Sequence, residues 1–282
     1  MLRLFAHLRR ACIHAVDHDC FNIAQATAYS AIVGLFPALI VAAALIAFVP
    51  DSLGVRYQLT VFFDRILPSN VSPLLQSYFA SRHPTPHSKH VLITAAIVSV
   101  TGAAGVISTF MEGFRRAYCL PLNDWGFWHK RAISFALVPL SLMPLGIASV
   151  LVVFGHVITH WMVLHITHDL RRSVLIIAWL IRWTVALTGS AALLVLIYHL
   201  GTPLRQSWRR SLPGAALATG LWFLSTLGFG TYVSRFANYA QVYGSLGAGI
   251  ALLIWLYIVA LSVLIGAEFN AQLFSKRHGQ RA

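Results

Sequence analysis

The sequence predicts an all-α, polytopic integral membrane protein with about six transmembrane helices. Two observations predict this fold class. Apolar residues make up 58% of the 282 residues and charged residues only 10%, against about 25% charged residues in a typical soluble domain. Six apolar stretches are also long enough to cross a hydrocarbon core of roughly 30 Å as helices. They cover residues 28–49, 91–111, 132–158, 173–200, 212–233 and 242–267.

The first 27 residues predict a separate element, an amphipathic helix on the cytoplasmic leaflet. Leu2, Leu8 and Val16 belong to a set of apolar residues at roughly helical spacing, and Arg9 and Arg10 lie elsewhere around the helix. The segment has no continuous apolar core and does not read as a secretory signal. We therefore expect this helix over 1–27, a six-helix transmembrane domain over 28–270, and a short basic cytoplasmic tail over 271–282.

Prolines and glycines mark where the spans bend or pack. Pro37 follows Gly34 in the first span, and Pro139 and Pro144 lie in the third. Each proline removes a backbone hydrogen bond, so it forms a hinge or is simply tolerated within a membrane helix. The segment between the first two spans carries apolar pieces at 55–67 and 71–79, which predict short amphipathic helices on the outer surface or re-entrant elements.

The sixth span begins with a glycine-rich run that includes Gly244 and Gly247. Small residues four apart let two helices approach closely in lipid. The run lacks the lysine and the preceding strand of a phosphate-binding loop, so we interpret it as a packing face.

The net charge of +13 favours contact with lipid rather than nucleic acid. Basic pairs such as Arg115-Arg116 and Lys130-Arg131 lie at the ends of apolar stretches, where they meet anionic headgroups. With the N-terminus inside, Lys and Arg are more frequent in the inner segments, which predicts that both termini are cytoplasmic. We expect membrane lipids as partners and no nucleic acid, and leave a homo-oligomer open.

The candidates for a substrate or ion pathway are Arg182, Glu112, Glu268, Asn270 and Tyr243. Arg182 lies within the fourth apolar stretch. A charge at mid-bilayer normally faces a partner or a cavity, so Arg182 binds an anion or a lipid phosphate there, or it reaches the outer headgroups if the true span starts later.

The two carboxylates among these candidates close spans at the cytoplasmic side. Glu112 ends the second span, where Arg115 or Arg116 can pair with it, and Glu268 ends the sixth, where a loop arginine can do the same. The alternative for each is a cation or proton site at the inner mouth of a pathway.

No residue pattern predicts catalysis or a cofactor. His14 and His18 are four residues apart, a spacing that can present two imidazoles to one zinc ion, but no further ligands are evident. Nucleophile elbows, metal-protease motifs, dinucleotide fingerprints and ATP-binding loops do not appear. We therefore expect neither an enzyme nor a bound metal.

Three segments carry a resemblance to a known family. They are Thr27-Ala28-Tyr29-Ser30-Ala31-Ile32-Val33-Gly34-Leu35-Phe36-Pro37, Tyr243-Gly244-Ser245-Leu246-Gly247, and Trp255-Leu256-Tyr257 running to Gly266-Ala267-Glu268-Phe269-Asn270-Ala271. In order and spacing, the chain resembles the YihY/virulence factor BrkB family across nearly its whole length. The resemblance implies about six transmembrane helices in a bacterial inner membrane. It implies no settled activity, although members of the family have been linked to serum resistance and discussed as possible transporters.

An older label for that family, ribonuclease BN, can be compared with the residues. A metal-dependent nuclease of that kind uses a His-x-His-x-Asp-His cluster, whereas His14-Ala15-Val16-Asp17-His18-Asp19 has a different spacing and two histidines. These residues do not support the nuclease label. The prolines of the first and third spans, Arg182 within a span and the carboxylates at the inner mouth instead favour transport of an anionic or lipid-like substrate. The alternative is an envelope assembly factor that acts through helix–helix contacts.

Overall fold

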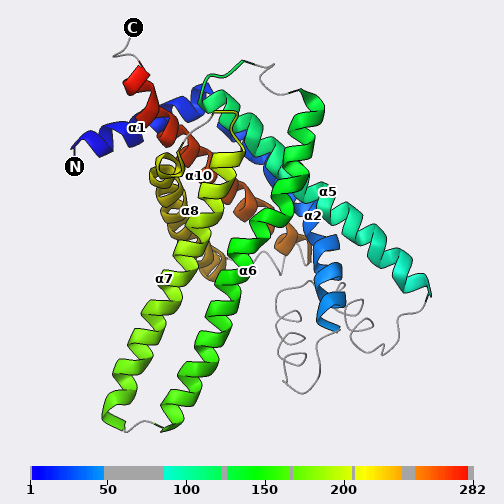
Figure 1. The fold of residues 1–282 in the computed structure, drawn as a ribbon, viewed down its shortest axis with the longest axis vertical. Helices are drawn as coiled ribbons and strands as arrows, with labels where there is room; N and C mark the ends of the chain where they lie inside the picture. The colour runs from blue at the N-terminus through cyan, green and yellow to red at the C-terminus, as the bar shows by residue number, and fades with distance from the viewer. Residues whose placement is uncertain are drawn as a thin grey trace. The chain divides into compact units, whose positions relative to one another are not determined.

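A computed structural model describes residues 2–47, 86–121, 126–165, 168–204, 207–236 and 245–278. In these residues all regular structure is helical and no strand occurs. The described helices, shown in Figure 1, are α1 (Leu2–Asp17), α2 (Cys20–Ala47), α5 (Pro86–Ala117), α6 (Phe127–His165), α7 (His168–Leu200), α8 (Trp208–Phe236) and α10 (Ser245–His278). The pieces predicted at 55–67 and 71–79 lie outside the described residues.

Five helices of the described part are long and apolar enough to cross a membrane. These candidate spans are Cys20–Ala42, Leu92–Ala117, Ser173–Leu200, Trp208–Tyr232 and Gly249–Leu273. The third predicted stretch, 132–158, lies within α6, which continues through Pro139 and Pro144. The predicted fold class, an all-helical polytopic membrane protein, is confirmed.

The surface of these helices is suited to lipid. On α7, consecutive large apolar side chains are about half exposed, among them Leu175, Ile176, Ile177, Leu180 and Ile181. Contiguous apolar surface of this kind is unfavourable in water. Lipid tails are as apolar as leucine, so the same surface carries no such cost in a bilayer.

The N-terminal segment differs from the single helix expected over 1–27. The helix α1 ends at Asp17, and α2 begins at Cys20, well before the predicted start of the first span. Asp19 adopts a left-handed conformation with φ of 61°, which aspartate tolerates better than most residues. The apolar spacing in the sequence continues from α1 into α2 across this turn. The spacing alone therefore did not reveal that the helix is broken there.

The described chain forms two compact units. Unit 1 comprises Met1–Ile23, Ile107–Leu224 and Leu261–Ala282, and unit 2 comprises Ala24–Val106 and Ser225–Ala260. In unit 1, α6 and α7 lie side by side as a long antiparallel pair (Figure 1). Phe114, Leu137 and Leu264, from α5, α6 and α10, are fully buried in this unit.

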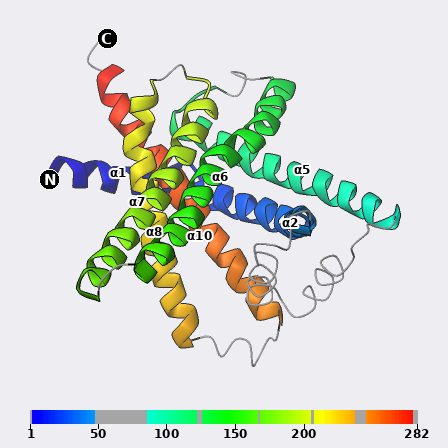
Figure 2. The same ribbon diagram turned by 60° about the horizontal axis from the view of Figure 1, so that its bottom comes forward.

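Unit 2 contains a close contact between two glycines. Gly34 of α2 faces Gly102 of α5, and a Cβ atom added to Gly102 would lie 2.6 Å from the Cα atom of Gly34. The two helices lie side by side where they meet (Figure 2). Only residues without a side chain permit this approach of two backbones.

This contact gives a stability prediction. Gly102→Val should destabilise the protein by about 1–3 kcal/mol, because the backbone of α2 has to move away from the new side chain. Gly249→Val is the matched control, since a Cβ atom there meets nothing within 4 Å in the described structure. Thermal unfolding of both variants in the same detergent measures the difference. Equal transition temperatures would contradict the contact.

Candidate functional site

Among the residues that the structure describes, Glu268 is the most deeply buried acidic or basic residue of unit 1. It lies near the end of α10, and its side chain has no exposed surface. Its Oε1 atom lies 2.7 Å from Nδ1 of His18 and 3.8 Å from Sγ of Cys20. The Oε2 atom is buried and has no hydrogen-bond partner among the described residues. One oxygen of this carboxylate is therefore satisfied and the other is not.

The turn between α1 and α2 positions the histidine. His18 lies directly after α1, where its backbone N–H donates to the carbonyl of His14, and the rings of the two histidines stack with centroids 5.7 Å apart. The side chain of His18 is 21% exposed. Its Nε2 atom lies 3.8 Å from Sγ of Cys119, which is exposed. The imidazole thus lies between the buried carboxylate and the outer surface of unit 1.

Cys119 is held by the C-terminal cap of α5. The N–H of Leu120 donates to the carbonyl of Arg115, and the N–H of Cys119 donates to that of Arg116. This is the Schellman pattern, in which one residue after the helix is left-handed. Cys119 takes that place with φ of 52°. We call His18, Cys20, Cys119 and Glu268 the Glu268 cluster.

A second group of charges, the Glu112 network, lies beside this cluster. Glu112 receives two hydrogen bonds from Arg115, at 2.6 and 3.1 Å, and one from Arg116 at 3.3 Å. The Nζ atom of Lys130 lies 3.4 Å from Glu112. Arg116 also pairs with Asp19 at 3.1 Å, so the network reaches the residue next to His18. A carboxylate with three cationic partners is stabilised as the anion.

The two carboxylates therefore differ in their partners. The sequence left ion pairing with Arg115 or Arg116 as one interpretation of Glu112, and the structure shows that pairing. A loop arginine was the corresponding expectation for Glu268, but its partner is His18 of the N-terminal turn. That contact joins residues 250 positions apart, and local sequence carries no signal for it.

Asn270 connects α10 to the start of α8. Its Oδ1 atom accepts from the N–H of Gly214 at 2.7 Å, and its Nδ2 atom donates to the carbonyl of Ser211 at 3.2 Å. Pro213 within this turn lacks a backbone donor. The buried side-chain amide of Asn270 thus bonds two backbone groups of α8 and holds α8 and α10 together. These are the contacts of a packing residue.

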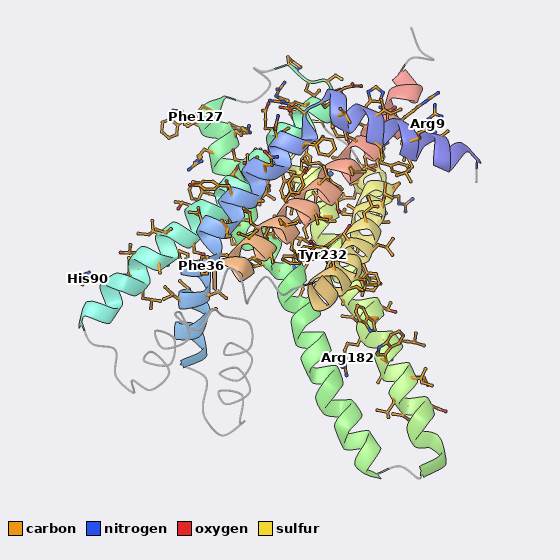
Figure 3. All side chains as sticks on the ribbon, turned by 180° about the vertical axis from the view of Figure 1, so that it is seen from behind. Arg9, Phe36, His90, Phe127, Arg182 and Tyr232 are labelled. Atoms are coloured by element: carbon orange, nitrogen blue, oxygen red, sulfur yellow. The ribbon has the colours of Figure 1, made fainter. Side chains whose placement is uncertain are left out.

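Arg182 lies apart from both groups. It lies 18 positions before Leu200, the last residue of α7, which corresponds to about 27 Å along a helix. In Figure 3, Arg182 lies far along α7 from the end of unit 1 that carries Arg9 and Phe127. It is partly exposed, and the described structure shows no hydrogen bond or ion pair to it. The structure thus brings Glu112, Glu268 and Asn270 to one end of unit 1 and leaves Arg182 outside.

The remaining sequence candidates fall elsewhere. Tyr243 and Gly244 lie outside the described residues, and Gly247 is buried within α10. Gly34 makes the contact with Gly102, and Pro37 lies inside α2. Among the residues that the structure describes, no group of three or more His, Cys, Asp or Glu side chains is placed to hold a metal ion.

Sequence reasoning did not identify His18 and Cys20 as neighbours of Glu268. The spacing of His14 and His18 was noticed as a weak metal pattern. A signal that could have pointed further is the Asp19 next to His18, because aspartate adopts the left-handed conformation more readily than most residues and so can end a helix there.

Comparison with known proteins places the chain in a family. The profile of virulence factor BrkB matches residues 11–282. The putative ribonuclease-like protein YfkH of Bacillus subtilis (strain 168) is 29% identical over 268 residues, which cover 92% of each chain. A UPF0761 membrane protein of Tolumonas auensis is 27% identical over 263 residues, covering 92% of this chain and 82% of the relative. No solved structure matches. The chain belongs to the virulence factor BrkB family.

Proposed function

We propose that this chain is a transport protein of the bacterial inner membrane, and that the His18–Glu268 pair binds the ion that drives it. The observation that carries the proposal is the buried carboxylate with one unpartnered oxygen. Removing an ionised carboxylate from water costs several kcal/mol unless partners replace the lost hydration. Ionisable groups kept within membrane helices at this cost commonly bind ions or protons.

Glu112 does not share this property. Its oxygens are occupied by Arg115, Arg116 and Lys130, so no position remains for a transported ion. We assign it the role of holding the ends of α5 and α6 together. This distinction supports a single ion-binding carboxylate, Glu268, rather than two.

Arg182 supports an anionic or lipid-like substrate. Its distance of about 27 Å from the end of α7 is close to the roughly 30 Å thickness of the hydrocarbon core. At that depth a guanidinium can reach phosphate groups at the opposite interface. We propose that Arg182 contacts the phosphate of a lipid headgroup or another anion there.

A second candidate function is an envelope assembly factor. It is favoured by the open glycine positions of unit 2, since Cβ atoms added to Gly228 of α8 and Gly249 of α10 meet nothing within 4 Å. Such positions allow close approach by a helix of another protein or a second copy. Crosslinks that recover a stable partner through α8 or α10 would favour this function.

We propose that the chain is not a ribonuclease. The word ribonuclease in the name of the Bacillus relative describes that protein. Here His14 and Asp17 pair with each other at 3.6 Å on the exposed side of α1. Chelator-sensitive cleavage of structured RNA by the purified protein would contradict this conclusion.

The transport proposal predicts the effect of neutralising one carboxylate. Glu268→Gln in proteoliposomes should abolish substrate uptake or exchange driven by an ion gradient, because glutamine cannot change its charge. Asp17→Asn, an exposed substitution on α1, should leave flux unchanged. The measurement is ion-gradient-driven flux, by solid-supported-membrane recording, of a panel of organic anions and phosphorylated lipids. Equal currents for wild type and Glu268→Gln would refute the assignment.

Native cysteines test the proposed orientation. Cys12 and Cys119 are exposed and Cys20 is buried. If both termini are cytoplasmic, a membrane-impermeant maleimide should label Cys12 and Cys119 in inverted vesicles and neither of them in intact spheroplasts. Cys20 should stay unlabelled in both preparations and serves as the internal control. Labelling of Cys12 in spheroplasts would reverse the topology.

A further inference from the structure

We propose that the ion bound by Glu268 is a proton, and that the imidazole of His18 carries it between the surface of unit 1 and the buried carboxylate. The inference rests on the proposed transport function and names the ion of that site. It is carried by the geometry of four side chains from three elements: His18 and Cys20 around the turn into α2, Cys119 after α5, and Glu268 of α10.

The atoms around Glu268 favour a proton over sodium, magnesium or calcium. Sodium, magnesium and calcium prefer several oxygen ligands. The described contacts of Oε1 are instead a ring nitrogen of His18 and the sulfur of Cys20. A proton needs only one acceptor, and the unpartnered Oε2 atom supplies a second position for it.

The two nitrogens of His18 face different surroundings. Nδ1 lies on the carboxylate, which has no exposed surface, while Nε2 lies beside the exposed Cys119. A neutral imidazole carries a proton on one nitrogen and accepts at the other. Such a ring passes a proton between its two sides without itself moving through the protein.

The transfer balances in protons and charge. A hydronium ion at the surface of unit 1 gives a proton to Nε2, which forms the imidazolium of His18 and leaves a water molecule. The proton on Nδ1 then moves to Oε1 of Glu268, which leaves a neutral carboxyl and a neutral ring protonated at Nε2. The pair changes from one net negative charge to none. Because an uncompensated charge is costly in an apolar interior, proton binding favours the buried arrangement of Glu268.

Other titratable and charged groups lie near the pair. His14 stacks on His18 from α1, and Cys20 and Cys119 contact the pair from α2 and from the end of α5. Arg116 lies nearby, but it is paired with both Asp19 and Glu112. Its charge is therefore largely compensated, and His18 remains the direct partner of the carboxylate.

The experiment is infrared difference spectroscopy of the full-length protein in lipid nanodiscs after a rapid drop in pH. Wild type should develop the carbonyl stretch of a protonated carboxyl in an apolar site. Glu268→Gln should lose this band, and the matched control Asp17→Asn should keep it. Persistence of the band in Glu268→Gln would overturn the proposal.

The role of His18 is tested by the rate at which the band appears. His18→Gln and His18→Ala should slow its rise by about 100-fold, the size of effect expected when a proton-transfer group is removed. Free imidazole in the buffer should restore the rate in His18→Ala, which a structural defect would not allow. An unchanged rate in both variants would overturn the relay. Size-exclusion chromatography confirms that each variant is folded.

Two further outcomes separate this inference from the transport proposal. A sodium jump at constant pH that perturbs the Glu268 carboxylate, with no proton-dependent band, would refute the proton and leave transport standing. A proton-dependent band that behaves as expected, without Glu268-dependent flux in proteoliposomes, would confirm the proton site and refute transport.

Discussion

The hydrogen bond between His18 and Glu268 is the interaction on which the described end of unit 1 depends. It joins the turn after α1 to the last part of α10, and so it ties the two ends of the chain together within one unit. A carboxylate without exposed surface requires a polar partner. The left-handed Asp19 turns the chain so that His18 can provide it. The cap of α5 places Cys119 on the far side of the same ring.

Close contacts hold α10 against α7 and α8 next to Glu268. Gly266 of α10 lies against the hydroxyl of Tyr198 and the carbonyl of Gly214, where a Cβ atom would collide. The hydroxyl of Tyr198 donates to the carbonyl of Val263 at 2.6 Å. With Asn270 bonded to α8, these contacts fix α10 on both sides of Glu268. The carboxylate is thus held by neighbours that leave its second oxygen unpartnered.

The sequence predicted the fold class well, and the site only in part. Hydropathy and length predict membrane helices well because a backbone in lipid must satisfy its own hydrogen bonds. Five predicted stretches overlap candidate spans in the described residues, and the stretch 173–200 matches its span at both ends. The same reasoning singled out Glu268 and Glu112, since carboxylates are rare in such helices. It did not find the break between α1 and α2, which depends on the left-handed backbone conformation of the single residue Asp19. It also did not find His18 as a partner, because a contact across 250 residues has no local pattern. Hydropathy also did not identify His168 as the first residue of α7. The predicted position of Arg182 along its span depended on that starting residue.

A double-mutant cycle tests the central contact most directly. Unfolding free energies in one detergent would be measured for wild type, His18→Gln, Glu268→Gln and the variant with both substitutions. Two side chains in direct contact should show a coupling energy of about 0.5–3 kcal/mol, with the double variant less destabilised than the sum of the single ones. Additive effects, with no coupling beyond experimental error, would contradict the account.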